Sequence, residues 1–319
     1  METFKIVMIG NTAVGKTSML AALSKELDKY NTARDVALEP TTHEFKVLQK
    51  QWIEMNEQVE AQTPFTTLSA GIEGALVDFV DHKFDFKVKG KTQAHVLFTD
   101  TRGAMTGDLD DKLVDRVNKA DGVFCVVDAS VLMECPGSKN ERYNCPDFVK
   151  ELLKKVYVTD GDDFQPRFVA FVLTKCEKQM ASAKGRRELS KRFHEKYDNI
   201  VDMLGKAKMP PSVYLLAIQT MVRVSFSKLN KDGWPEFKIN PPKYIDQNGK
   251  KTEIKTKDCA YPLVVSLREL IEKIEEADSK GFFGPFVRLL KWLGLLEDLR
   301  DYLSEIDDKI EEPDLYEEL

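Results

Sequence analysis

One short segment constrains the fold of this 319-residue chain more than any other: Gly10-Asn11-Thr12-Ala13-Val14-Gly15-Lys16-Thr17. It fits the pattern GxxxxGK[ST], the Walker A motif or P-loop, and it lies between an apolar run over residues 4–9 and a helical pattern over residues 16–27. In such a loop the glycines let backbone N–H groups wrap around phosphate oxygens, and the N-terminal end of the following helix adds positive charge. The segment therefore predicts a strand, a phosphate-binding loop and a helix, and a purely structural glycine loop is the alternative.

Two side chains of the motif carry most of its chemistry. The Lys16 ammonium group can reach the β- and γ-phosphates of a nucleotide, and the Thr17 hydroxyl can ligate Mg²⁺. We predict Lys16 as a catalytic residue and Thr17 as a metal ligand. The predicted phosphate-binding residues are Gly10, Asn11, Thr12, Ala13, Val14, Gly15, Lys16, Thr17 and Ser18.

The rest of the chain alternates strand-like and helix-like segments, which is typical of an α/β fold with a mostly parallel sheet. The predicted strands cover residues 4–9, 82–88, 94–100, 122–128, 167–173 and 212–217. The predicted helices cover residues 16–27, 110–119, 147–158, 186–204 and 262–277. Two long stretches, residues 30–81 and 221–261, do not fit the alternation and are interpreted as insertions.

A second motif, Asp100-Thr101-Arg102-Gly103, follows the strand predicted over residues 94–100. An acidic residue at a strand end beside a P-loop can hold Mg²⁺, and the Gly103 N–H can contact a γ-phosphate. Asp100 is therefore a predicted metal residue, and Gly103 is a predicted nucleotide-binding residue. The alternative is an ordinary Asp-Gly turn after a strand.

A third motif, Thr174-Lys175-Cys176-Glu177, follows the strand predicted over residues 167–173. At this element the chain resembles the Ras-like GTPases of the TRAFAC class, which carry [NT]KxD there. In that family the lysine packs over the base and the carboxylate pairs with guanine N1 and N2. The resemblance implies that Thr174, Lys175 and Glu177 bind the base, although Glu177 is one methylene group longer than the family's aspartate.

A fourth element, Ala217-Ile218-Gln219-Thr220, is similar to the SA-type loop of the same family, which presents a backbone N–H to guanine O6. Ala217 and Ile218 are therefore implied nucleotide-binding residues. This loop and the long insertions also resemble bacterial TRAFAC-clade GTPases of predicted defence or conflict modules. Over residues 1–277 the resemblance implies a Ras-like P-loop NTPase domain, with a six-stranded, mostly parallel sheet, helices on both faces and residues 82–88 running antiparallel.

The resemblance also implies cofactors and a reaction, namely Mg²⁺ with GTP or GDP and slow hydrolysis of GTP to GDP and phosphate. A switch I threonine should sense the metal, and Thr41 and Thr66 are competing candidates. Hydrolysis should be slow because Ala104 occupies the place where many relatives carry a water-orienting glutamine. Arg102 is a catalytic candidate that either contacts the γ-phosphate or is a solvated switch residue. An effector or activating protein is the expected partner, and self-association is a second expected source of acceleration.

Residues 278–319 are expected to form a C-terminal amphipathic helix and an acidic tail. Apolar residues recur at steps of three or four over residues 284–310. Packing on the body is favoured, and docking of residues 282–300 on a membrane surface or a partner is the alternative. The acidic end is predicted to be a solvated tail, comprising Glu311, Glu312, Asp314, Glu317 and Glu318.

Charge and cysteine usage exclude some classes of function. The chain has a net charge of −6, and residues 297–319 hold 11 acidic and 2 basic residues. The remainder of the chain is therefore near neutral in charge, so no nucleic-acid partner is expected. Residues 228–258 contain eight lysines with interleaved aromatic residues, and a solvated hairpin arm is favoured there over a nucleic-acid contact. Five cysteines without CxxC spacing, and no apolar run of about 18 residues, indicate a reducing, cytoplasmic setting.

Three other functions remain as alternatives. A P-loop kinase would need a lid, and no arginine-rich lid stands out in the sequence. An ATPase of the AAA or transporter kind usually has glutamate after the strand aspartate, where Thr101 stands here. The third alternative is a nucleotide-bound interaction scaffold with little hydrolysis.

Overall fold

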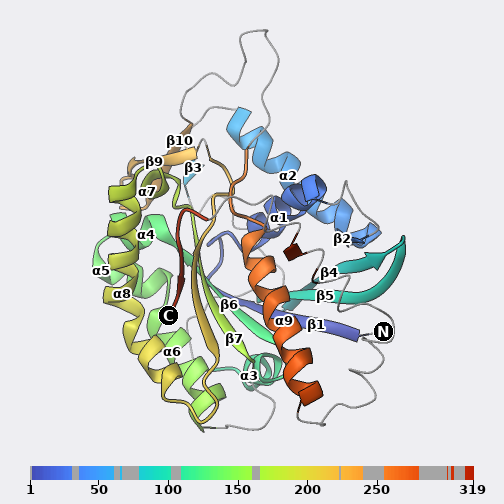
Figure 1. The fold of residues 1–319 in the computed structure, drawn as a ribbon. Coiled ribbons are helices and arrows are strands. Elements are labelled where there is room, and N and C mark those ends of the chain that lie inside the picture. The colour runs from blue at the N-terminus through green and yellow to red at the C-terminus, as the bar shows by residue number, and fades with distance from the viewer. Residues whose placement is uncertain are drawn as a thin grey trace.

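The computed structural model describes residues 2–30, 36–60, 65–66, 79–101, 109–159, 166–222, 224–239, 255–279, 300, 303–304 and 313–319. Its main element is an eight-stranded sheet in the order β11-β8-β7-β6-β1-β5-β4-β2 (Figure 1). Five adjacent strands are parallel: β1 (Glu2–Ile9), β5 (Lys91–Thr101), β6 (Gly122–Asp128), β7 (Phe168–Thr174) and β8 (Ser212–Ala217). Three strands run antiparallel to the neighbour that they pair with: β4 (Phe79–Val88), β2 (Val36–Pro40) and β11 (Tyr316–Glu318). The expected α/β fold with a mostly parallel sheet is thereby confirmed.

The predicted number of six strands is wrong, because the sheet has eight. The six predicted strands lie next to one another from β8 to β4, and one further strand pairs at each edge. β2 belongs to the first stretch interpreted as an insertion, and it pairs with β4 from Val36 to Pro40. β11 has only three residues, two of them glutamates, so its sequence carries no alternating apolar pattern.

Helices cover both faces of the sheet and divide the core into two clusters (Figure 1). On one face lie α1 (Lys16–Tyr30), α2 (Thr42–Glu60) and α9 (Tyr261–Ser279). On the other face lie α3 (Asp111–Asn118), α6 (Pro146–Lys154), its π-helical continuation η2 (Lys155–Thr159) and α8 (Ala183–Gly205). Successive strand residues point to opposite faces, so Phe124 joins the first cluster and Cys125 the second. Because both faces are covered, β6 and β7 are buried along their whole length, which explains their uninterrupted apolar sequences.

A second, antiparallel sheet joins the two insertions. It comprises β3 (Phe65–Thr66), β10 (Pro235–Ile239) and β9 (Val224–Leu229), in that order. The prediction of a solvated arm over residues 228–258 is wrong for the apolar residues of the β9–β10 hairpin, and residues 240–254 lie outside the described part of the chain. Phe237 is only 3% exposed, and the Trp234 ring packs against the ring of Tyr143.

The prediction of a solvated acidic tail is wrong for the last residues of the chain. Leu315 is buried. The Asp314 carboxylate lies 2.5 Å from the Lys257 Nζ atom, and the Glu317 carboxylate lies 2.9 Å from the His194 Nε2 atom. These contacts hold β11 against the edge of the sheet.

Most of the predicted C-terminal amphipathic helix lies outside the described residues, as does nearly all of residues 282–300. The membrane and partner alternatives for that segment therefore stay predictions. Within the described parts of the chain, no helix is long and apolar enough to cross a bilayer. The five cysteines are all buried and form no disulfide bonds: Cys125, Cys135, Cys145, Cys176 and Cys259.

Candidate functional site

The predicted site residues follow different parallel strands and meet at one edge of the sheet. The P-loop follows β1, and Asp100, near the end of β5, lies opposite Met8 of β1. Thr174 ends β7, and Ala217 ends β8. Because the carboxyl ends of parallel strands lie at the same edge of a sheet, the fold gathers these motifs there.

The P-loop takes its shape because two of its positions exclude a side chain. A Cβ atom on Gly10 would lie 2.8 Å from the Val126 carbonyl oxygen and 2.9 Å from the Val14 Cγ2 atom. Gly15 has a φ of +110°, which residues with a side chain rarely adopt. Helix α1 begins directly after it, at Lys16. A tight loop that ends at a helix N-terminus presents backbone N–H groups in an arrangement suited to an anion.

The polar centre of the site consists of Lys16, Thr17 and Asp100. The Lys16 Nζ atom donates to the carbonyl oxygens of Gly10 at 2.6 Å and Asn11 at 3.1 Å, and it lies 3.5 Å from the Asp100 Oδ1 atom. The Thr17 hydroxyl donates to the Asp100 Oδ2 atom at 3.0 Å. Lys16 and Asp100 are 6% and 3% exposed, so solvent and salt screen their attraction only weakly.

The oxygen atoms at this point fit Mg²⁺. The Asp100 Oδ1 atom is buried and accepts no hydrogen bond from the described residues. Carboxylate and hydroxyl oxygens are hard ligands of the kind that Mg²⁺ takes, and one or two protein ligands suffice because the ion keeps water and phosphate ligands. Thr17 and Asp100 are therefore the residues that would hold the ion.

The loop after β7 is attached to the P-loop by two short hydrogen bonds. The Thr174 hydroxyl donates to the carbonyl oxygen of Val14, and the Lys175 Nζ atom donates to that of Ala13, both at 2.5 Å. Ala13 and Lys175 have φ values of +63° and +54°, which is a strained conformation for residues with a side chain. Such strain persists where surrounding contacts over-determine it, and here the two strained residues contact each other.

Asp128 is a site residue that the sequence interpretation missed. It ends β6, its side chain is fully buried, and its Oδ2 atom lies 2.8 Å from the Lys175 Nζ atom. Its Oδ1 atom accepts hydrogen bonds from the Ser130 hydroxyl and the Val131 N–H at the start of α4 (Ala129–Glu134). A signal in the sequence could have identified Asp128, because it is an acidic residue at the end of an apolar strand, as Asp100 is.

Glu177 lies next to the loop that follows β8, residues 217–220, which we call the β8 loop. Glu177 begins α7 (Glu177–Met180), is 7% exposed, and accepts a 3.3 Å hydrogen bond from the Met221 N–H. Burial raises the pKa of Glu177 to about 7, although backbone N–H donors and the nearby Lys175 oppose the rise. The Cys176 thiol donates to the Ile218 carbonyl oxygen at 3.2 Å. The third and fourth motifs of the sequence therefore lie side by side, and all of their residues except Lys175 are buried.

A contact that the sequence did not reveal links the P-loop to α5 (Gly137–Tyr143). The Tyr143 hydroxyl donates to the Thr12 carbonyl oxygen, and the Asn11 carboxamide donates to the Tyr143 carbonyl oxygen, both at 3.1 Å. The Tyr143 and Trp234 ring centroids are 5.3 Å apart. Tyr143 therefore connects the P-loop to the β9–β10 hairpin. No local pattern predicts a contact between residues 131 positions apart.

The two switch I candidates lie in different parts of the fold. The Thr41 N–H donates to the carbonyl oxygen of Lys83 on β4, which lies next to β5 and two positions from β1 in the sheet. Thr66 lies in β3, opposite Glu236 in the small sheet. The choice between them stays a prediction. Arg102, Gly103 and Ala104 lie outside the described residues.

Comparison with known proteins gives little beyond this geometry. No family model matches the chain, and no curated protein matches it. Among solved structures, the bacterial selenocysteine-specific elongation factor EF-Sec is similar with a TM-score of 0.33 and 12% sequence identity. The match covers 69% of this chain and 26% of the elongation factor, so the chain spans about a quarter of that protein's length. A likeness at this score carries no argument about function.

Proposed function

We propose that this chain binds guanine nucleotides with Mg²⁺ and hydrolyses GTP slowly, as a molecular switch. One observation supports the proposal above all. Lys16, Thr17 and Asp100 are joined by hydrogen bonds and an ion pair at the end of a glycine loop that leads into a helix. A lysine, a hydroxyl and a carboxylate at such a loop form the combination that phosphoryl-transfer sites use to bind phosphate and metal.

The phosphate contacts follow from the hydrogen bonds within the loop. The Lys16 Nζ atom donates to two carbonyl oxygens of the P-loop, those of Gly10 and Asn11. In the proposed complex, phosphate oxygens replace these carbonyl groups as acceptors and pair with the full charge of the ammonium group. Thr17 and Asp100 hold Mg²⁺, which neutralises phosphate charge when it is bound.

The base contacts are proposed for the loops after β7 and β8. The Lys175 side chain reaches from β7 to the P-loop, and this contact supports the proposal that the base packs against its stem. The Glu177 carboxylate pairs with guanine N1–H and N2–H. The β8 loop borders the base, and its Ala217 and Ile218 N–H groups already donate to backbone carbonyl oxygens. Adenine has no donor at N1, so a site with a buried carboxylate at this place disfavours ATP.

Substitution of Lys16 tests the phosphate site. We expect Lys16→Ala to weaken binding of GTP at least about 100-fold, because charge-assisted hydrogen bonds to phosphate are lost. The matched control is Lys50→Ala on α2, where the lysine side chain is 79% exposed and far along the chain from the motif. Calorimetric titration of both variants with GTP makes the comparison. Wild-type affinity in the Lys16 variant would refute the P-loop assignment.

Slow hydrolysis is the finer part of the proposal. Ala104 has no side-chain hydrogen-bonding group to orient water, and Thr12 at the exposed lip of the P-loop leaves less room for an arginine supplied in trans. We expect dilute wild-type protein to hydrolyse GTP slowly in single-turnover assays, and faster turnover to require a partner or self-association. Arg102→Ala should leave the slow rate unchanged, whereas an arginine acting on the γ-phosphate would contribute about 10³–10⁵ in rate. Fast turnover by dilute wild type that survives this substitution contradicts the account.

A further inference from the structure

The C-terminal residues 315–319 pair with β8 up to Ala217, the first residue of the β8 loop. β11 lies antiparallel to β8, with Glu318 opposite Tyr214 and Tyr316 opposite Leu216. The pairing continues one step further, because the Ala217 N–H donates to the Leu315 carbonyl oxygen at 3.2 Å. The C-terminal segment therefore holds the backbone of the residue from which the β8 loop departs.

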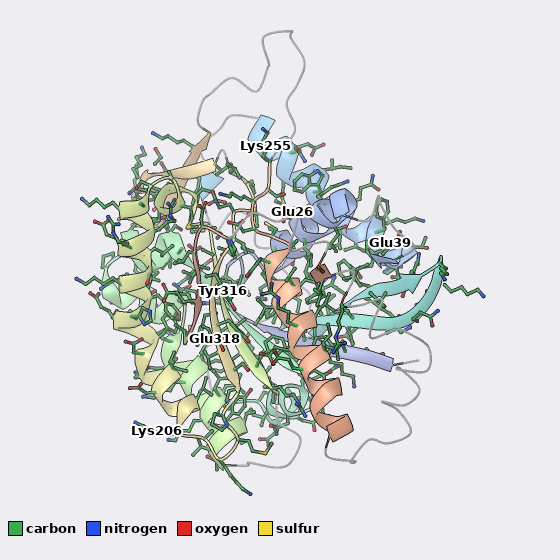
Figure 2. All side chains as sticks on the ribbon, viewed as in Figure 1. Glu26, Glu39, Lys206, Lys255, Tyr316 and Glu318 are labelled. Carbon is green, nitrogen blue, oxygen red and sulfur yellow. The ribbon has the colours of Figure 1, made fainter. Side chains whose placement is uncertain are left out.

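A second segment, residues 255–260, borders the β8 loop on another side. Gln219 and Lys257 exchange two backbone hydrogen bonds of 2.9 Å, and the Val222 N–H donates to the Lys255 carbonyl oxygen at 2.9 Å. The Ala260 N–H then donates to the Glu26 carboxylate of α1 at 2.7 Å. Lys255 and Glu26 mark this path in Figure 2. The segment thus connects the β8 loop to the helix that begins at the P-loop.

Asp314 joins these two supports. Its Oδ2 atom lies 2.5 Å from the Lys257 Nζ atom, and its Oδ1 atom lies 3.8 Å from Arg186 on α8. Asp314 therefore contacts the residue that pairs with Gln219, while its neighbour Leu315 contacts Ala217.

The tail is also held by ring contacts and by a partly exposed ion pair. The Tyr316 ring lies against Tyr261 at 5.2 Å between centroids, and Glu317 pairs with His194, whose side chain is 35% exposed (Figure 2 labels Tyr316 and Glu318 of β11). A three-residue edge strand with exposed ion pairs is docked weakly compared with the central strands. Small changes in the tail should therefore change how firmly it holds the β8 loop.

We propose that residues 314–319 position the β8 loop for the base of a bound nucleotide, with Asp314 and Leu315 as its positioning residues. This inference rests on the proposed function, in which the β8 loop contacts guanine. A docked tail keeps the backbone of residues 217–220 in place before the nucleotide arrives, which lowers the cost of ordering on binding. Undocking the tail accelerates release of the nucleotide and leaves the phosphate site intact.

The test compares a ligand that has a base with one that has none. GDP dissociation is followed with a fluorescent GDP analogue, and inorganic tripolyphosphate reports on the phosphate site alone. Asp314→Asn should accelerate GDP dissociation about fivefold, as expected for losing one partly exposed ion pair, with tripolyphosphate affinity unchanged. Lys257→Gln should accelerate GDP dissociation to a similar extent, because it removes the other partner of the same ion pair. Glu39→Gln is the matched control, since Glu39 pairs with Lys87 at 2.7 Å on the opposite edge of the sheet.

Deletion of residues 314–319 should have a larger effect than the point substitution, at least about tenfold on GDP dissociation, because the main-chain pairing is lost as well. The point variants keep the test decisive if the truncated chain does not fold. Wild-type GDP dissociation in Asp314→Asn, or an equal loss of GDP and tripolyphosphate affinity, overturns the positioning role. If wild-type protein binds GDP no more tightly than tripolyphosphate, the proposed function itself fails at the base site, and this inference fails with it.

Discussion

At the scale of single residues, the candidate site is organised by side-chain donors that bind carbonyl oxygens of the P-loop. Lys16 binds the Gly10 carbonyl, Lys175 binds that of Ala13, and Thr174 binds that of Val14. Each bond fixes the orientation of one peptide plane, so the opposite edge of that plane, with its N–H, is fixed too. The loop is in this way organised for an anion before one binds.

Glu177 gives the first prediction at this scale, a pH dependence. Burial raises its pKa to about 7 in the nucleotide-free protein, so it is largely protonated at pH 6. Guanine N–H donors would favour the carboxylate and lower that pKa, so binding releases a proton and affinity rises with pH until about pH 7. We expect GDP affinity to be about tenfold higher at pH 8 than at pH 6. The affinity is measured relative to that of tripolyphosphate, so that the titration of the phosphate groups cancels.

The same residue predicts a trend in stability. The folded-state pKa of Glu177 lies above its ordinary value of 4.5, so the folded protein binds more protons than the unfolded chain between about pH 4.5 and 7. The contribution of Glu177 to stability therefore falls as pH rises through that window. Glu177→Gln should remove both trends. Calorimetry in buffers of different ionisation enthalpy counts the released proton, and an identical count for GDP and tripolyphosphate would contradict the assignment of Glu177 to the base.

Some of these residues were predictable from sequence, and others were not. Lys16, Thr17 and Thr174 stand in short motifs whose spacing is dictated by one loop or one strand end, so local sequence is sufficient to locate them. Tyr143 belongs to no motif, because its role arises only when α5 packs beside the P-loop. Asp128 was detectable in principle, since an acidic residue at the end of a buried strand needs a partner.

At the scale of elements, α5 joins the P-loop to the β9–β10 hairpin. Tyr143 hydrogen-bonds the loop with its hydroxyl and packs on Trp234 with its ring, and Lys139 of the same helix lies 4.7 Å above the Trp234 ring centroid. Tyr143 therefore contacts both the P-loop and the hairpin. A change in the P-loop conformation on nucleotide binding is transmitted to the hairpin through this residue. The hairpin is an insertion, so its position beside the loop could not be read from the motifs of the α/β domain.

Removing one hydroxyl tests this connection. Tyr143→Phe keeps the ring contact with Trp234 but loses the bond to Thr12, and a bond of this kind contributes about 1 kcal/mol. We expect GDP to bind about fivefold more weakly, because the free loop is less well ordered. Tyr157→Phe is the matched control, since its buried hydroxyl donates to the Pro166 carbonyl oxygen at 2.7 Å, far from the P-loop. Equal effects of the two substitutions on GDP affinity would show that Tyr143 acts only through general stability.

At the scale of the whole molecule, the fold explains why the site lies where it does. The chain places β5 on one side of β1 and β6 on the other, and the P-loop emerges from β1 at this reversal of strand order. Such switch points in open α/β sheets leave a crevice between the connections on either side. The central strands were predictable because burial on both faces imposes continuous apolar sequence. The edge strands β2 and β11 were not predictable from the sequence. Each pairs with a neighbour on one side only, and each mixes polar and apolar residues instead of forming a continuous apolar run.

The central claim is that the P-loop and the loops after β7 and β8 form a guanine nucleotide site. The most direct measurement is a calorimetric comparison of GTP, GDP and ATP with the wild-type protein in the presence of Mg²⁺. The account predicts one saturable site for GTP and GDP, with ATP at least about 100-fold weaker because adenine offers no N1–H or N2–H to Glu177. Lys16→Ala should abolish tight binding of all three. Equal affinity for ATP and GTP, or no binding of either, would contradict the claim.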